Sequence, residues 1–121
     1  MTIEGVGVDM VEIDRIKAAL QKWGDNLEKR ILASQELRVV KDFNQKAVFL
    51  AGRFAAKEAI FKALEINPDW HEVLVLTGKK GEPVVILSSK ILKRIERKVK
   101  KVLVSISHCK SYALAQAMVI G

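Results

Sequence analysis

A single long helix, expected over residues 45–64, places the strongest constraint on how this chain can fold. Its second half reads GRFAAKEAIFKAL over 52–64 and is rich in alanine and leucine, which favour helices. At about 100° per residue the small apolar side chains fill one broad arc, which we expect to pack inward. The other half mixes charges with aromatic rings, which is unusual for a solvated face. Its members are Arg53, Phe54, Lys57, Glu58, Phe61 and Lys62.

Shorter elements are expected on both sides of this helix. A helix should follow the first strand and end at Gly24, with Trp23 closing its buried stripe, and a basic helix over 89–101 should bury Leu92. The order of strands and helices indicates one α+β domain over 1–121, with a mainly antiparallel sheet packed against helices. The expected strands are 2–10, 71–77, 84–88, 102–107 and 112–120, with one or two short helices in 26–43.

Composition limits the possible environment and partners. The chain has 121 residues and one cysteine, so it cannot form an intramolecular disulfide, which fits a reducing cytoplasm. No apolar run is long enough to cross a membrane, and we expect no membrane partner. The net charge of +7 predicts an anionic partner, which could be nucleic acid, a phosphorylated small molecule or an acidic protein. With one tyrosine and two tryptophans, the stacking surface of a single-strand nucleic-acid binder would be thin.

Two carboxylates are candidate metal ligands. Alternation in GVGVDM places Asp9 on a strand face with two glycines, where a ligand can approach closely, although a strand-ending carboxylate in water is the plainer reading. Glu58 could simply pair with Lys62 four residues later, but such a pair contributes only about 0.2–0.5 kcal/mol. A hard cation such as Mg²⁺ would explain both carboxylates if the fold brings them together.

Basic groups could meet the phosphates of a ligand. We expect Arg53, Lys57 and Lys62 to lie on the same half of the helix as Glu58, where they form either a phosphate site or a solvated rim. His108 ends the strand 102–107 and could donate to a phosphate. Cys109 is a poor nucleophile candidate because neighbouring strand residues point to opposite faces.

Two helices carry basic surfaces. The helix over 89–101 is interpreted as a solubilising face. The first helix presents Arg15, Ala18 and Lys22 opposite its buried stripe, and this small basic patch could receive an acidic helix of another protein.

Three motifs together resemble those of the bacterial holo-acyl-carrier-protein synthases, which are small 4'-phosphopantetheinyl transferases. They are GVGVDMVEIDRI, FLAGRFAAKEAIFKAL and VSISHCKSYALAQAMVI, in the family's order and spacing. The resemblance implies transfer of 4'-phosphopantetheine from coenzyme A to a serine of apo acyl carrier protein in fatty acid biosynthesis. It also implies Mg²⁺, release of adenosine 3',5'-bisphosphate, and a cytoplasmic homotrimer with its sites at subunit interfaces.

The resemblance also assigns roles to residues. Asp9 and Glu58 correspond to the metal ligands, and with Lys62 they form the expected catalytic set. The coenzyme A contacts are expected from Arg53, Lys57, Lys62, Pro83 and His108, and Arg15 belongs to the carrier-docking helix. The chain departs from the family at ALEINPDWHEV, which lacks a Gly-Thr-Gly-type loop, and at Cys109, where threonine is common.

The expected mechanism is attack of the carrier serine on the phosphorus that carries the pantetheine arm, with Lys62 sharing the charge of the pyrophosphate. Either Glu58 or a water on the metal could take the serine proton. Two other functions remain open at this point: a small basic nucleic-acid- or ribosome-associated module, and an inactive relative that still docks the carrier protein.

Overall fold

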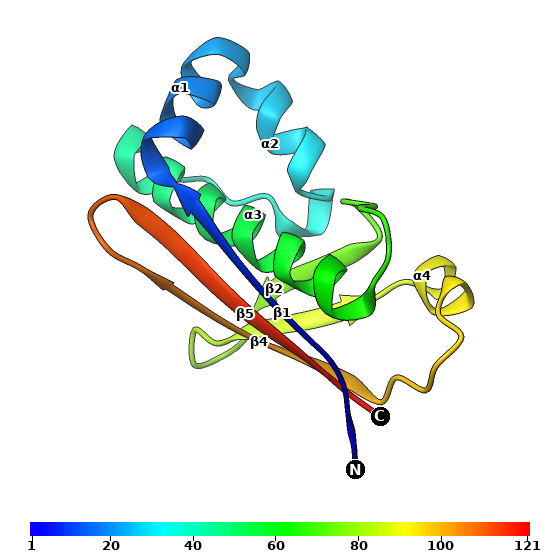
Figure 1. Ribbon diagram of the computed structural model, residues 1–121. Coiled ribbons are helices and arrows are strands. Elements are labelled where there is room, and N and C mark those ends of the chain that lie inside the picture. The colour runs from blue at the N-terminus through cyan, green and yellow to red at the C-terminus, as the bar shows by residue number, and fades with distance from the viewer.

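A computed structural model describes residues 1–121 as one α+β domain (Figure 1). Its elements follow the expected order along the chain. They are β1 (Ile3–Glu12), α1 (Ile13–Trp23), α2 (Asp25–Ile31), the short 3-10 turn η1 (Ser34–Glu36), α3 (Phe43–Leu64), β2 (Val73–Thr77), β3 (Pro83–Leu87), α4 (Ser89–Arg94), β4 (Lys101–His108) and β5 (Tyr112–Ile120). None of these helices is long and apolar enough to cross a membrane.

The strands form two antiparallel sheets. The larger has the order β1-β5-β4, and the smaller is the hairpin of β2 and β3. In the larger sheet Ala115 pairs with Asp9 on one side and with Ile106 on the other. α3 runs across the inner face of this sheet, and α1 and α2 cover the opposite side of α3 (Figure 1). The expected α+β class with antiparallel sheets is therefore confirmed.

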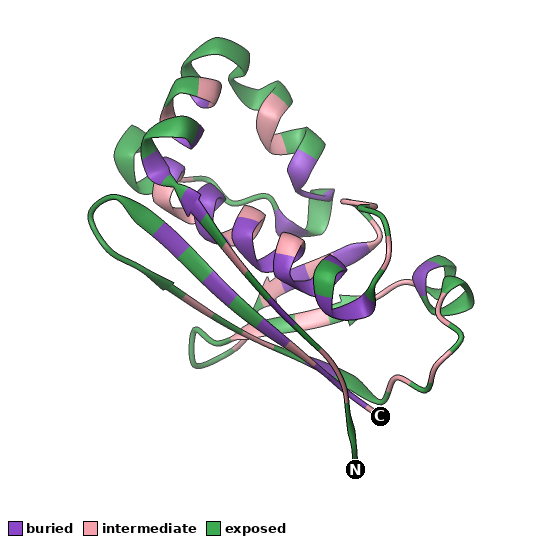
Figure 2. Ribbon diagram, in the orientation of Figure 1, coloured by how far each residue is buried: buried purple, intermediate pink, exposed green.

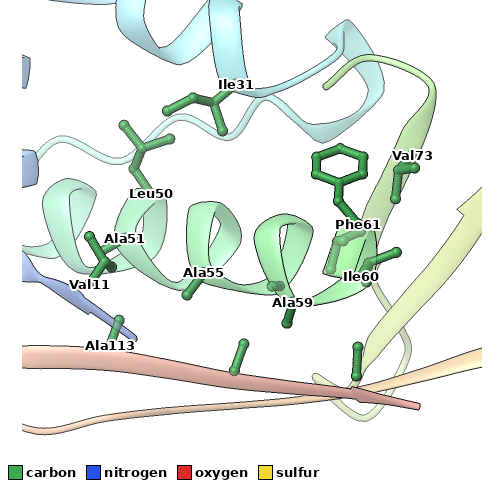
Figure 3. Close-up of a cluster of buried hydrophobic side chains, with 14 of the residues drawn as sticks. Val11, Ile31, Leu50, Ala51, Ala55, Ala59, Ile60, Phe61, Val73 and Ala113 are labelled. Atoms are coloured by element: carbon green, nitrogen blue, oxygen red, sulfur yellow. The ribbon is translucent and has the colours of Figure 1, made fainter. Parts of the chain in front are cut away.

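The long helix α3 packs against the larger sheet, α1 and β2, so it carries buried residues on several sides. Its alanines Ala51, Ala55 and Ala59 lie toward β5, whereas Leu50 lies toward Ile31 at the end of α2 (Figure 3). At its start the Asp42 carboxylate accepts a hydrogen bond from Gln45 N at 2.8 Å, which satisfies one free amide of the first turn. The helix ends at Glu65, which takes a left-handed conformation with φ 58° and ψ 44°.

Glycine and alanine let α3 approach the sheet closely. A Cβ atom on Gly5 would lie 2.0 Å from the carbonyl oxygen of Ala63, and one on Gly7 would lie 2.0 Å from that of Ala59. The inward residues of β5 are the fully buried Ala113 and Ala117 and the nearly buried Ala115. The two glycines of β1 thus make room for the backbone of α3, and not for a ligand as the strand pattern suggested.

Two expectations about the helices are wrong. Leu92 lies within α4 but is 47% exposed instead of buried. α4 ends at Arg94, so residues 95–100 are not helical. A helix there would place many like charges three or four residues apart, which is unfavourable. The Arg97 guanidinium instead donates to the carbonyl oxygens of Glu4 and Ala63, where it ties this segment to β1 and α3. Trp23, expected in the core, is 55% exposed.

Exposed and buried residues alternate along β5 in the larger sheet (Figure 2), and many of the exposed residues on the outer face of this sheet are apolar. Alternation along each strand gives one buried and one exposed set of side chains. Val6, Val8, Met10, Leu103 and Leu114 belong to the exposed set and define what we call the outer sheet face. An exposed apolar surface of this kind marks a site of association.

Candidate active site

The structure brings Asp9, Glu58 and Lys62 together, and we call this group the carboxylate site. Asp9 comes from the inner face of β1, and the other two lie one turn apart on α3. Lys62 Nζ lies 3.0 Å from Asp9 Oδ1 and also donates to the carbonyl oxygen of Val8 at 3.0 Å. The lysine therefore binds β1 rather than forming only a local pair along its own helix.

The electrostatics of this site favour a cation. Partial burial raises the pKa of Glu58, the negative charge of Asp9 raises it further, and Lys62 opposes both effects. One ammonium group thus serves two neighbouring carboxylates. Oxygen ligands carrying excess negative charge are suited to a hard divalent cation, and Mg²⁺ commonly needs only one or two protein carboxylates. The described residues contain no cluster of three or more metal-ligating side chains, so water or substrate would complete the coordination shell.

Arg53 lies on another side of α3, about 140° around the helix from Glu58. Its guanidinium donates to Thr77 Oγ1 at 2.8 Å, and its Cζ lies 4.8 Å from the ring centre of Phe49. Arg38 approaches the same ring, with its Cζ at 5.2 Å. Burial lowers the pKa of Arg53, Glu36 raises it, and Arg38 lowers it again. These four residues, Arg38, Phe49, Arg53 and Thr77, line a cavity of about 330 Å³ that we call the arginine cleft.

The arginine cleft is open to a bound anion. Two guanidinium groups share one ring without an acidic partner within salt-bridge distance, and the Arg53 Nε is buried without a hydrogen-bond partner. Pro83 lies close by because it pairs with Thr77 across the hairpin. Arg38 and Phe49 also line a neighbouring cavity of about 420 Å³, which His108 borders. Arg53 and His108 line two different cavities that share Arg38 and Phe49, and Pro83 is connected to the first of them only through its pairing with Thr77.

The structure places Lys57 elsewhere than expected. Its side chain is completely buried, and its Nζ donates to Glu36 Oε1 at 2.6 Å and to the carbonyl oxygens of Ile31 and Trp70 at 2.9 and 2.6 Å. The expectation that Lys57 faces phosphates is therefore wrong in this structure. The basic residues of α3 do not share one half of the helix, since Lys62 faces β1, Arg53 faces β2 and Lys57 faces the core.

The phenylalanines of α3 also face away from the carboxylate site. Phe54 stacks on Trp70 with ring centres 5.2 Å apart, and Phe61 meets the same ring edge-on at 5.3 Å. The three rings hold the 65–72 connection against α3. Where the family has a glycine-rich loop, this chain has a connection whose Trp70 packs against Phe54 and Phe61 of α3.

Arg15, Ala18 and Lys22 are all exposed on α1, as the helical pattern predicted. Ile13, Ile16 and Leu20 hold the opposite side of the helix in the core. Lys22 Nζ lies 4.9 Å from the ring centre of Trp23, so the exposed tryptophan extends the same surface. A basic surface with an aromatic side chain is suited to an acidic protein partner.

Three residues of the arginine cleft region were not found by sequence reasoning. Arg38 lies in a segment without clear periodicity, and Phe49 resembles an ordinary core residue of α3. Glu36 gave only a weak signal, although its side chain is fully buried and its charge acts on Arg53. The only hint available was a basic residue two positions after an acidic one, which is common on protein surfaces.

The fold and the sequence together define the class of protein to which this chain belongs. A family model described as the 4'-phosphopantetheinyl transferase superfamily matches residues 5–117. The chain belongs to this superfamily. The alternative of a basic nucleic-acid-binding module is not favoured by this result.

Individual relatives are similar over nearly the whole chain. A holo-[acyl-carrier-protein] synthase from Dehalococcoides mccartyi is 42% identical over 115 residues, which cover 93% of this chain and 94% of the relative. The crystal structure of the synthase from Neisseria meningitidis has a TM-score of 0.85 at 26% identity, covering 99% of this chain and 100% of the other. The synthase from Helicobacter pylori in complex with coenzyme A has a TM-score of 0.83 at 28% identity, covering 95% and 99%.

Proposed function

We propose that this protein is a holo-acyl-carrier-protein synthase that transfers 4'-phosphopantetheine from coenzyme A to a serine of apo acyl carrier protein. The observation that carries the proposal is the meeting of Asp9, Glu58 and Lys62 at one point between β1 and α3. The relatives named above support the substrates, since they are synthases of holo carrier protein and one of them holds coenzyme A. The product would serve fatty acid biosynthesis in the cytoplasm.

Asp9 and Glu58 fit a bound Mg²⁺, because both supply oxygen ligands whose negative charge is only partly neutralised within the chain. When bound, the ion would neutralise charge on the pyrophosphate as it is cleaved. Lys62 contributes a positive charge beside the same phosphates. The two carboxylates and the lysine are held on rigid elements, which keeps the reacting groups in position.

In the reaction the carrier serine oxygen bonds to the phosphorus of the pantetheine arm. The bond from that phosphorus to the bridging oxygen breaks, and adenosine 3',5'-bisphosphate leaves with the electron pair. The serine proton must go to a base of suitable pKa. Either Glu58 or a water molecule at the carboxylate site would take this proton.

The arginine cleft suits the phosphates at the nucleotide end of coenzyme A. Arg38 and Arg53 offer several donors that no acidic side chain neutralises at salt-bridge distance, and guanidinium groups bind phosphate through paired hydrogen bonds. His108 lines the neighbouring cavity that shares Arg38 and Phe49, and Pro83 pairs with Thr77 of the cleft. Lys57 has no part in this contact, since its ammonium group is used inside the core.

A homotrimer would unite the two parts of the site. The carboxylate site and the arginine cleft lie on different sides of α3, so one chain alone does not present them to a single ligand. The outer sheet face is apolar and exposed, and it includes Val8 and Met10, the two neighbours of Asp9. Asp9 points to the other side of β1, but β1 is an edge strand, so a subunit packed on this face would lie just across that strand from the carboxylate site. The α1 surface of Arg15, Ala18 and Lys22 would remain free to dock the acidic carrier protein.

The decisive experiment incubates the purified protein with apo carrier protein, coenzyme A and Mg²⁺, and follows the intact mass of the carrier. The expected result is the addition of one phosphopantetheine group. Glu58→Gln should abolish the addition while circular dichroism shows an intact fold. Glu65→Gln is the matched control, because it neutralises an exposed carboxylate at the end of the same helix. No adduct with any divalent metal would refute the transferase, and full activity of Glu58→Gln would remove Glu58 from the site.

A further inference from the structure

Three separate segments of the chain build the arginine cleft. α3 contributes Phe49 and Arg53, the residues after η1 contribute Arg38, and β2 contributes Thr77. The segments follow one another along the chain, but Arg38, Arg53 and Thr77 are at least 15 residues apart in sequence. The spacing of the two guanidinium groups therefore depends on whatever fixes η1 and β2 against α3.

The carboxylate of Glu36 joins all three segments. Its Oε1 accepts from Ala33 N at 2.8 Å and from Lys57 Nζ at 2.6 Å, and its Oε2 accepts from Val75 N at 2.7 Å. Val75 lies two residues before Thr77 on β2, Glu36 lies two residues before Arg38, and Lys57 lies one helical turn after Arg53 on α3. Each wall of the cleft is thus connected to this single buried carboxylate.

Lys57 completes the connection on the other side. Its three donors are all used, by Glu36, by Ile31 at the end of α2 and by Trp70 in the connection after α3. Both side chains of the pair are 0% exposed, so neither can exchange its partner for water. A movement of η1 or β2 relative to α3 would break at least one of these buried hydrogen bonds, and leaving a buried polar group unpaired is costly.

We propose that Lys57 and Glu36 are positioning residues for coenzyme A binding. They hold Arg38 and Arg53 at the spacing that the nucleotide phosphates require. The proposal rests on the assignment of the arginine cleft to coenzyme A made above. Under this proposal Lys57 affects coenzyme A binding without touching coenzyme A. It takes no part in the reaction at the carboxylate site.

The test compares coenzyme A affinity with stability. Replacing one partner alone would leave a buried charge unpaired, which is strongly destabilising, so the main variant is the double substitution Lys57→Met with Glu36→Gln. It should raise the Kd of coenzyme A, measured by calorimetry, by about tenfold, as expected when a charge-assisted phosphate contact is lost. The KM for coenzyme A should rise in parallel while kcat stays within about twofold, because the carboxylate site is untouched.

Ile91→Ala is the control for stability, since it truncates a completely buried side chain of α4 that takes no part in the cleft. If the double variant does not fold, the positioning role is tested with Glu36→Asp instead. That variant keeps the charge but shortens the side chain, so the carboxylate cannot hold Ala33, Lys57 and Val75 together. It should also raise the Kd of coenzyme A beyond the value of the control.

The outcomes separate the two proposals. Arg53→Ala should weaken coenzyme A binding if the arginine cleft is the phosphate site, and an unchanged Kd in that variant would refute the assignment of the cleft. If Arg53→Ala weakens binding but the folded positioning variants bind coenzyme A as tightly as Ile91→Ala, the positioning role is wrong and the cleft assignment stands. A folded positioning variant with weakened binding and normal kcat supports the inference.

Discussion

Gly7→Ala should damage both the fold and the activity, because it pushes α3 away from the sheet. The new Cβ would lie 2.0 Å from the carbonyl oxygen of Ala59 and 2.8 Å from the amide nitrogen of Ala63. Carbon and oxygen in ordinary contact are roughly 3.3 Å apart, so the helix would have to move by about 1 Å or more. Both clashing groups are backbone, and no change of rotamer can relieve them.

The size of the effect follows from this geometry. Overpacking typically costs about 1–3 kcal/mol, and we expect at least the upper end of that range here. Out of a typical total of about 5–15 kcal/mol, this loss should lower the urea midpoint by about 1 M or more. The displaced helix carries Glu58 and Lys62, which must meet Asp9 two residues beyond Gly7. A misplacement of about 1 Å can reduce a rate by roughly a hundredfold.

Urea unfolding and the carrier-mass assay measure the two effects. Gly52→Ala is the matched control, because its Cβ would meet only the Cγ2 methyl of Ile106 at 3.1 Å, a contact that needs a shift of a few tenths of an ångström, and alanine favours the helix by about 1 kcal/mol relative to glycine. The control should keep nearly normal stability and activity. If Gly7→Ala behaves like Gly52→Ala in both assays, the close approach of α3 does not determine the site, and the reasoning fails.

Three further predictions concern single features of the structure. Glu65→Gly should raise the free energy of unfolding by about 0.5–1 kcal/mol in urea titrations, because glycine adopts the left-handed cap without strain; a loss of stability would contradict this account. In a chelator, Glu58→Gln should melt at a higher temperature than wild type at pH 7. Because the pKa of Glu58 is higher in the folded protein than in the unfolded chain, ionised Glu58 destabilises the fold. This destabilisation grows as the pH rises from the ordinary carboxyl pKa through the raised one, and below that range the two proteins should melt at the same temperature. Met10→Lys should reduce the molar mass in light scattering by breaking a trimer through the outer sheet face, whereas Leu92→Lys, on exposed α4, should not.

Local patterns were sufficient to predict the strands and the orientation of Asp9, Glu58 and Lys62 on their own elements. Strict alternation in β1 places Asp9 on the same face as the two glycines, and helical spacing places Lys62 one turn after Glu58. The close approach of β1 and α3 then brings the three side chains together. Such predictions succeed because each depends on the period of one element.

The position of Lys57 could not be predicted in the same way. Its partner Glu36 is 21 residues away, and its other acceptors belong to two further segments, so only the tertiary structure shows that the ammonium group is satisfied inside the core. The prediction of a helix over 89–101 was wrong for a similar reason. Its apolar spacing is helical, but the Arg97 contacts with β1 and α3 draw the segment into an irregular path toward β4.

The contact between Lys62 and Asp9 has a consequence for how the protein is made in the cell. A site of two carboxylates without a cation of its own would repel itself during folding and would have to wait for metal, as zinc-dependent domains do. Here the ammonium group of α3 reaches β1 and supplies the missing positive charge from within the chain. Under the proposed magnesium role, a newly synthesised subunit should therefore reach its final shape when free magnesium is scarce, and metal supply should limit turnover rather than the amount of folded protein.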